Sequence, residues 1–519
     1  MENYFKRVGK GSVTIFLCIV LSGIFGYFLR MYLTRTVSVA EYGLFFAVFS
    51  LIAFLVSIIG LGLYSSLTKY LSEFIVTNEL KKIKYSLKFV FLAQLAITMI
   101  FMLVIFFISH DIAIYFFKSQ AAEPILNILL VFLLVYTWMF FFRHAFQGMR
   151  RMLELGFTFI LYSGLALLFL IALFSFSSSM ITNIAYAYVL GTAATVIVCF
   201  IFFLKDLRQL GKIPSLSKKE KAVVRKSLIM FGIPVIFIGI ANSILSNIDT
   251  LIITYFRSTY EVGIYQTALP TAQILLYFSS AMTTILFPII TELWTKKKYQ
   301  FISTNLSLLT KLTFLLIIPA AMLFIAFPEN VINILFGADY ISGAFALQLL
   351  TISIAVFSIG MLFTITLNGM NKPGLNAKII GIAAVLNIII NIFLVPILGI
   401  IGAAITAIIT FGLYFLLSSA CVIREFKKKN ISFTVPYKEL AKIFAGVYIS
   451  LTIIFITKIM LVSHPLIELA AALMLGVGFY IFWVFYAKCI TKNDIKTIKK
   501  TSLPIPAFIL DTLERFAKN

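Results

Sequence analysis

The feature that most constrains this chain is a series of apolar stretches, each long enough to cross a lipid bilayer as a helix. About 20 residues span the hydrocarbon core, and the 519-residue sequence contains fourteen such stretches. They begin near residues 12, 42, 86, 124, 155, 180, 228, 262, 307, 342, 376, 399, 440 and 465. With 61% hydrophobic and only 12% charged residues, a soluble fold would expose much apolar surface. The sequence therefore predicts an all-α integral membrane protein with fourteen transmembrane helices.

The positions of the basic residues set the predicted orientation. If the N-terminus is cytoplasmic, 38 of the 43 Lys and Arg residues fall in cytoplasmic segments. The outer side receives only Arg30, Arg35, Lys118, Arg257 and Lys458. Cytoplasmic loops are enriched in Lys and Arg, so the net charge of +23 reflects topology and does not indicate a nucleic-acid partner. We predict a multi-pass protein of the cell membrane with both termini cytoplasmic and short outer loops.

Three pairs of short segments indicate an internal repeat. "SVAEYGLF" (38–45) resembles "STYEVGIY" (258–265), and "DIAIYFF" (111–117) resembles "VINILFG" (331–337), both at a separation of 220 residues. "QGM" (147–149) resembles "NGM" (368–370) at a separation of 221. The separation contains six helices, and an even number gives both copies the same orientation. Parallel repeats of this kind are common in transporters.

The repeat predicts the domain organisation. Two parallel six-helix lobes are joined by a long basic segment and followed by two extra helices. The predicted parts are an N-lobe (1–204), a basic cytoplasmic linker (205–227), a C-lobe (228–425), the two extra helices (426–489) and a cytoplasmic tail (490–519).

Two charged residues lie at matching depths in the first helix of each predicted lobe. Asp249, in "LSNIDTLIITYF", lies eight residues before Arg257, which is about 12 Å from the outer end of its helix. Its repeat counterpart is Leu29, next to Arg30. Ionisable residues inside membranes are usually functional, so Asp249 and Arg30 are predicted to face a cleft, where they pair or share a hydrated cavity. Two alternatives stay open: Asp249 braces a helix end beside Asn247, and Arg30 snorkels outward.

Two further cations are candidate substrate contacts. Arg143 lies near the inner end of the fourth span and Lys311 near the start of the ninth. Arg143 is either an interfacial anchor or a substrate ligand. Lys311 either snorkels or lines an inner vestibule.

Motifs for catalysis, metal binding and cofactor binding are missing. The four cysteines are far apart and form no CxxC pair, so neither a metal site nor a disulfide framework is predicted. "GKGS" (9–12) lacks the upstream glycine and the strand-to-helix setting of a phosphate loop. We therefore expect a protein that is not an enzyme and carries no cofactor.

Four segments resemble the polysaccharide-transporter branch of the multidrug/oligosaccharidyl-lipid/polysaccharide exporter superfamily. They are 35–74, 231–270, 287–293 and 334–340, and "NIDTLIITYF" with "EVGIYQTALP" is the most specific combination. The resemblance implies a flippase in which the headgroup of a polyprenyl (di)phosphate-linked oligosaccharide crosses an often cationic cavity between two lobes. Asn247 and Asp249 match the family motif, whereas the proposed role of Arg30 depends only on its depth.

Other functions remain open at this stage. An ion-coupled multidrug antiporter of the same superfamily would use Asp249 as its proton or sodium site. A glycan polymerase or ligase usually needs a large outer loop, which this chain lacks, and a non-transporting scaffold would not depend on Asp249 or Arg30. The expected partners are a polyprenyl-linked glycan, membrane lipid and possible glycan-assembly proteins, and the expected state is a monomer.

Overall fold

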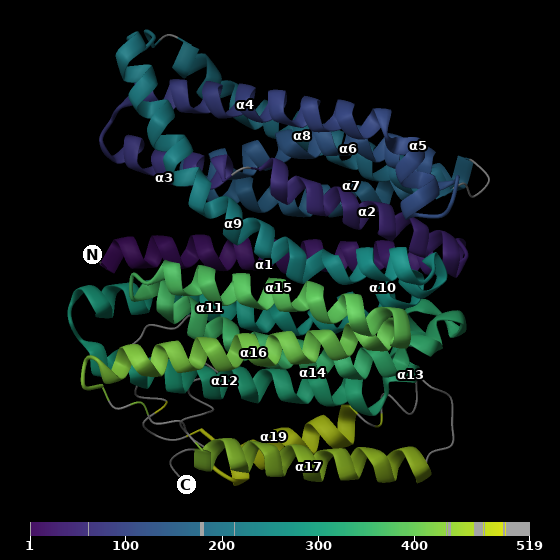
Figure 1. Ribbon diagram of the computed structural model, residues 1–519. Coiled ribbons are helices and arrows are strands. Elements are labelled where there is room, and N and C mark those ends of the chain that lie inside the picture. The colour runs from purple at the N-terminus through teal and green to yellow at the C-terminus, as the bar shows by residue number, and fades with distance from the viewer. Residues whose placement is uncertain are drawn as a thin grey trace. The chain divides into compact units, whose positions relative to one another are not determined.

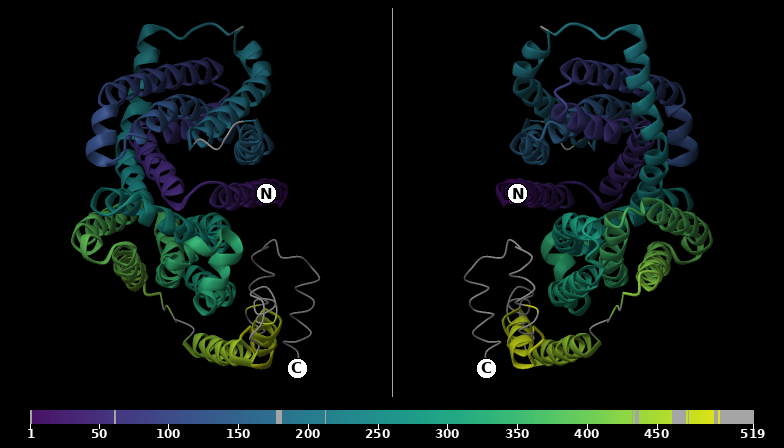
Figure 2. Two further views of the ribbon diagram at one scale, coloured as in Figure 1. Left: turned by 90° about the vertical axis from the view of Figure 1, so that its right-hand side faces the viewer. Right: turned by 90° about the vertical axis from the view of Figure 1, so that its left-hand side faces the viewer.

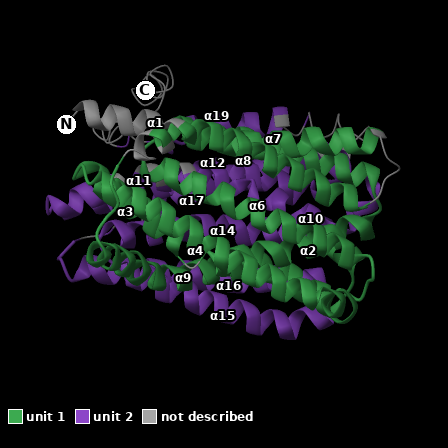
Figure 3. Cartoon of the chain, turned by 90° about the horizontal axis from the view of Figure 1, so that it is seen from above, with its two compact units in different colours: residues 1–263 green, residues 264–519 purple. Residues whose placement is uncertain are grey.

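The computed structural model describes residues 2–60, 62–176, 181–211, 213–431, 433, 437–460, 471, 473–490 and 494 (Figure 1). These residues form helices and connecting turns and contain no strand. They divide into two compact units, Met1–Gly263 and Ile264–Asn519, coloured separately in Figure 3. The all-α fold class is therefore confirmed, and each unit is described by itself below.

The first unit consists mainly of long helices that run alongside one another (Figures 1 and 2). Its elements are α1 (Glu2–Thr36), α2 (Val39–Ile59), α3 (Leu63–Val76), α4 (Leu80–Phe107), α5 (Ser109–Asp111), the π-helical turn η1 (Ile112–Phe116), α6 (Ala122–Gly148), α7 (Met152–Phe176), α8 (Ile181–Gly211) and α9 (Lys218–Phe256). α1 packs on α7, α7 on α8, α6 on α8, and α2 on α9. The predicted linker between the lobes, 205–227, overlaps the end of α8 and the start of α9, and all of α9 belongs to this unit.

The second unit begins within α10 (Thr259–Gln273). It continues with α11 (Leu275–Thr295), α12 (Tyr299–Ala326), α13 (Pro328–Phe336), the 3₁₀ turn η2 (Ala338–Gly343), α14 (Ala344–Gly369), α15 (Pro373–Leu398), α16 (Ile400–Lys427), α17 (Tyr437–Met460), the π-helical turn η3 (Leu473–Val477) and α19 (Gly478–Tyr486). α14 packs on α16 and α11, and α17 packs on α12 and α19.

Twelve described helices are long and apolar enough to cross a membrane, and each corresponds to one predicted span. The span predicted from residue 262 is divided between α10 and α11, which are separated by Ile274. The span predicted from residue 465 starts outside the described residues, and its described part is the shorter apolar helix Met474–Tyr486. The predicted tail, 490–519, also lies outside the described residues except for residues 490 and 494.

Local sequence signals explain where the helices begin. Ser38 caps α2: its side chain accepts a hydrogen bond from the Glu41 backbone N–H at 3.3 Å, and Glu41 accepts one from the Ser38 N–H at 2.9 Å. The same reciprocal capping box joins Ser217 and Glu220 at the start of α9. Pro373 occupies the first turn of α15, where its missing N–H costs nothing.

The backbone repeats along the chain. Short elements interrupt both halves at equivalent places, α5–η1 between α4 and α6, and α13–η2 between α12 and α14. Non-glycine residues with positive φ also recur: Asn78 and Lys297 have φ of 56° and 55°, and Arg150 and Asn371 both have φ of 60°. Because such residues are uncommon, their recurrence at separations of 219 and 221 residues supports the repeat seen in the sequence.

Two equivalent glycines form a reciprocal contact within the first unit. A Cβ atom on Gly43 would lie 1.8 Å from the Thr259 carbonyl oxygen, and one on Gly263 would lie 2.3 Å from the Val39 carbonyl oxygen. Gly43 and Gly263 are 220 residues apart, and so are Val39 and Thr259. Gly43 therefore contacts Thr259, and their equivalents Gly263 and Val39 contact each other in the same way. A reciprocal pair of contacts of this kind is characteristic of two-fold symmetry. The starts of α2 and α10 thus meet symmetrically, and only glycine fits at either position.

Candidate functional site

Arg30 is a half-buried cation near the C-terminal end of α1. Its guanidinium Nη1 donates a hydrogen bond to the Tyr42 hydroxyl at 3.1 Å and lies over the Phe46 ring, 4.1 Å from the ring centroid. Both partners lie on α2, which starts at the Ser38 cap only a few residues after α1 ends. The short connection therefore places a hydroxyl and an aromatic face against the same charge, as in cation–π contacts.

Arg143 on α6 is a second cation of the first unit, and it is buried with 8% exposure. Its Nε donates to Thr158 Oγ1 at 3.0 Å, and its Nη2 donates to the Thr158 carbonyl oxygen at 3.2 Å. The guanidinium also lies 4.2 Å from the Phe159 ring centroid and 5.6 Å from that of Tyr162. This burial excludes the interpretation of Arg143 as an anchor in the lipid headgroups, and the partners named here all lie on α7.

Tyrosines connect the two arginines. The charges of Arg30 and Arg143 both act on the Tyr162 phenol, and Tyr136 also hydrogen-bonds Arg143. The Tyr162 ring centroid lies 5.9 Å from that of Tyr136 and 6.5 Å from that of Tyr188. We call this group the two-arginine cluster; its members are Arg30, Tyr42, Tyr136, Arg143, Tyr162 and Tyr188.

Sequence reasoning missed the tyrosines of the two-arginine cluster. They come from four different helices, α2, α6, α7 and α8, so no local motif joins them. One signal was available in the sequence. Tyrosine is usually enriched at the two interfaces of a membrane, whereas three tyrosines here lie inside their spans: Tyr136, Tyr162 and Tyr188.

The chemistry of the cluster suits an anionic, hydroxyl-rich group. Guanidinium groups form strong, often bidentate hydrogen bonds to phosphate oxygens. Phenol hydroxyls both donate and accept hydrogen bonds, and aromatic faces add apolar contact area.

Asp249 and Asn247 lie on α9, on which the resemblance placed the family motif. Asp249 is buried with 6% exposure. Asn247 is half-buried, and its amide nitrogen donates to the Ser243 carbonyl oxygen on the preceding turn at 3.2 Å. α9 packs on α2, the helix that carries the Tyr42 partner of Arg30. The proposed pairing of Asp249 with Arg30 stays a prediction.

Lys311 belongs to the second unit and has a different environment. It lies on α12 with 3% exposure, and its ammonium forms an ion pair with the Asp494 carboxylate. Burial excludes a side chain that snorkels to the interface. The ion pair accounts for this lysine without a substrate, so its place among the substrate ligands stays a prediction.

In the described part of the chain, no group of three or more His, Cys, Asp and Glu side chains is arranged to hold an ion.

Comparison with known sequences identifies the family. The sequence model described as "Polysaccharide biosynthesis protein" matches residues 8–294, more than half of the chain. The chain belongs to this family. The model described as MatE also matches, over residues 234–393, so the two matches overlap across the second part of α9, all of α10 and most of α11.

Two archaeal proteins are similar in sequence. An uncharacterized membrane protein of Methanocaldococcus jannaschii, MJ1068, is 28% identical over 513 residues, which is 96% of this chain and 98% of that protein. The probable low-salt glycan biosynthesis flippase Agl15 of Haloferax volcanii is 26% identical over 271 residues, which is 52% of this chain and 56% of Agl15.

Solved structures share the fold at lower identity. The lipid II flippase MurJ in an inward closed conformation matches with a TM-score of 0.72 and 15% identity, over 92% of this chain and 99% of MurJ. An inward-facing MATE family multidrug transporter of the MOP superfamily matches with a TM-score of 0.61 and 17% identity, over 80% of this chain and 95% of that chain. Together these findings describe a multi-pass membrane protein of the polysaccharide biosynthesis family that shares its fold with MurJ and with MATE transporters.

Proposed function

We propose that this protein is a flippase for a lipid-linked oligosaccharide or polysaccharide precursor carried on polyprenyl phosphate or diphosphate. It moves the headgroup across the cytoplasmic membrane by alternating access. The two-arginine cluster carries this proposal, because it combines two guanidinium groups with several phenols inside apolar helices. The similarity to Agl15, a probable low-salt glycan biosynthesis flippase, supports the substrate class.

The physical problem of the reaction is desolvation. Moving a hydroxyl from water into an alkane-like medium without a hydrogen bond costs roughly 4–8 kcal/mol, and an oligosaccharide carries many hydroxyls. In the proposed mechanism the phenols replace part of the lost hydration, and Arg30 and Arg143 hold the phosphate. The polyprenyl chain stays in the lipid.

The proposed topology completes this mechanism. Fourteen spans form two parallel lobes, 1–204 and 228–425, that open alternately to either side, and the linker 205–227 joins them. Residues 426–489 add two helices, both termini are cytoplasmic, and the protein acts as a monomer.

Transport in proteoliposomes tests the proposal. The substrate is a fluorescent oligosaccharide on polyprenyl diphosphate, and movement is followed by its accessibility to an impermeant quencher. Wild type should move the substrate. Arg30→Met and Arg143→Met should each slow the movement at least about tenfold, because each removes one charge-assisted contact to the phosphate. The control Arg208→Met, at an exposed position on α8, should leave the rate unchanged. Absence of movement of any polyprenyl-linked glycan by wild type contradicts the proposal, as does wild-type rate in both cluster variants.

A second candidate, an ion-coupled antiporter for small molecules, is favoured by one observation. The buried Asp249 lies within the segment that matches the MatE model, and a buried carboxylate in a membrane helix is suited to bind a proton or sodium ion. In this case an ion gradient drives efflux of a cationic dye, Asp249→Asn abolishes the efflux, and the glycolipid does not compete with the dye.

A further inference from the structure

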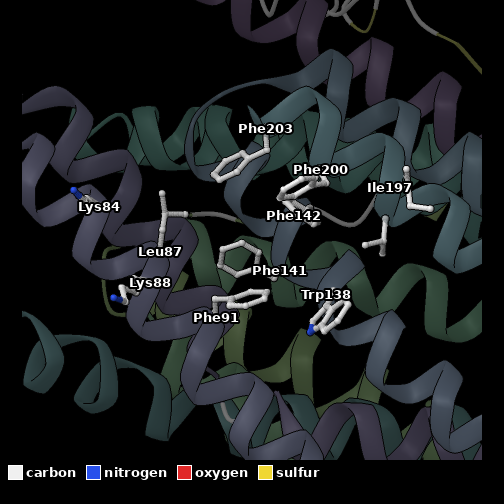
Figure 4. Close-up of a pocket in the computed structure, with 11 residues that line it drawn as sticks. Lys84, Leu87, Lys88, Phe91, Trp138, Phe141, Phe142, Ile197, Phe200 and Phe203 are labelled. Carbon is white, nitrogen blue, oxygen red and sulfur yellow. The ribbon is translucent and has the colours of Figure 1, made fainter. Parts of the chain in front are cut away.

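A pocket of about 580 Å³ lies between α4, α6 and α8 in the first unit (Figure 4). Its volume falls in the range of small-molecule sites, about 300–1,000 Å³. None of the two-arginine cluster residues lines it. Six aromatic side chains do: Phe91, Trp138, Phe141, Phe142, Phe200 and Phe203.

The pocket is accessible from the outer surface of the unit. Of its lining residues, Ile197 and Phe200 on α8 are 60% and 47% exposed. In a membrane, such exposed apolar side chains face hydrocarbon. A lipid chain can therefore enter this pocket directly from the bilayer.

The lining surface of the pocket is apolar, and two lysines border one end of it. Lys84 and Lys88 line it and lie one helical turn apart on α4, and Figure 4 shows both ammonium groups at the same side. The Lys84 ammonium donates to the Ile213 carbonyl oxygen at 2.7 Å. Ile213 precedes α9 in the basic segment that is predicted to be cytoplasmic. The two charges thus lie where the headgroups of that leaflet are expected.

Trp138 forms part of the pocket wall. The indole Nε1–H of Trp138 is buried and has no acceptor among the described residues. The Trp138 ring lies 6.2 Å from that of Phe91, which follows Lys88 by one turn of α4. The indole nitrogen contributes no accessible surface to the pocket, so Trp138 senses an occupant of the pocket through its ring.

We propose that this pocket is a binding site for an anionic phospholipid. The phosphate binds Lys84 and Lys88, and one hydrocarbon chain fills the space between the aromatic rings. The occupant is a membrane lipid and not the transported glycolipid, since the pocket is separate from the two-arginine cluster. This inference does not depend on the proposed function.

Tryptophan fluorescence tests the site on the full chain. The sequence has three tryptophans, so replacing Trp294 and Trp483 by Phe leaves Trp138 as the only probe. The protein is placed in zwitterionic vesicles, and a phospholipid with brominated chains is added in anionic or zwitterionic form. Each lysine near a membrane surface contributes about 1 kcal/mol of attraction to anionic lipid. The anionic form should therefore quench Trp138 at a mole fraction on the order of tenfold lower.

Two double variants with equal loss of charge locate the effect. Lys84→Gln with Lys88→Gln should abolish the anionic preference. Lys81→Gln with Lys82→Gln, on the same helix but outside the pocket lining, should retain it. Native mass spectrometry of the chain with its natural tryptophans should show one retained anionic lipid, which the first double variant loses.

Three results would overturn the inference. Equal quenching by the two brominated lipids excludes anionic selectivity. Equal effects of the two lysine pairs indicate a general surface attraction. Loss of the preference in millimolar inorganic phosphate identifies a site for free phosphate.

Discussion

Arg143 and Lys311 are both buried cations on membrane-spanning helices, and their environments differ completely. Arg143, in the first unit, is 8% exposed and binds the hydroxyl and carbonyl of Thr158 and two aromatic rings. No described carboxylate forms an ion pair with it. Lys311, in the second unit, is 3% exposed and is paired with the Asp494 carboxylate. The charge of Arg143 is surrounded by neutral groups, whereas the charge of Lys311 is balanced by a carboxylate.

We interpret this difference as a structural role for Lys311 and a substrate-binding role for Arg143. A buried ion pair contributes little net free energy, but removal of one partner leaves an uncompensated charge. Lys311 and Asp494 therefore tie α12 to a residue far along the chain. A guanidinium that is solvated only by neutral groups retains a positive field, which an anionic headgroup can use. Four substitutions test this interpretation, and the expected effects decrease as the charge becomes more exposed.

Replacing Asp494 by Asn should give the largest loss of stability. The Lys311 ammonium would stay buried without its counter-ion, which typically costs about 3–5 kcal/mol. The thermal unfolding temperature in detergent, followed by near-UV circular dichroism, measures this loss.

A double variant serves as the control for Asp494→Asn. Lys311→Met combined with Asp494→Leu removes both charges and should recover most of the lost stability, because a buried pair is often replaceable by apolar residues. If the double variant is as unstable as the single one, the pair is not the cause.

Arg143→Met should affect transport much more than stability. Thr158 still has a partner after the change, since its hydroxyl also donates to the Leu155 carbonyl oxygen at 2.7 Å. We expect a destabilisation of about 1–2 kcal/mol with a loss of glycolipid flipping of at least about tenfold. Arg143→Lys should stay impaired, because an ammonium does not reproduce the planar arrangement of guanidinium donors. Full activity of Arg143→Met would show that its charge is only structural.

Tyr42→Phe should have a smaller effect, through Arg30. The change removes the hydrogen bond of 3.1 Å to the half-buried Arg30 and leaves the ring and the Phe46 contact in place. One hydrogen bond to a charged group contributes about 1.5 kcal/mol, so flipping at low substrate concentration should fall by about tenfold or less. Tyr260→Phe, at an exposed position, is the matched control. An equal loss in both variants would remove Arg30 from the mechanism.

The sequence allowed the helices to be predicted much better than the partners of the charges. Apolar length alone located twelve spans that the structure contains, and the letters "SVAE" indicate the capping box at Ser38. Arg143 and Lys311, in contrast, look alike in sequence, because each is a single cation in an apolar run. The partner that distinguishes them, Asp494, is 183 residues from Lys311. No periodicity or local motif encodes a contact of that separation.

The smallest effect is expected at an ion pair that is open to solvent. His110, between α5 residues Ser109 and Asp111, lies 2.8 Å from a Glu123 carboxylate oxygen through its Nδ1. The hydrogen bond and charge of Glu123, with a further contribution from Asp111, raise the pKa of His110 above its usual value of about 6.5. A raised pKa in the folded state stabilises the protein below about pH 6.5, and this contribution disappears as the pH rises through the folded-state pKa.

His110→Gln should therefore lower the unfolding temperature slightly at about pH 5 and leave it unchanged at about pH 8. Because both side chains are partly exposed, salt should screen the difference. This behaviour contrasts with the Lys311–Asp494 pair, whose contribution should be insensitive to salt. A salt-dependent loss at Asp494→Asn, or a salt-independent one at His110→Gln, would contradict the view that burial governs how strongly each of these charges acts.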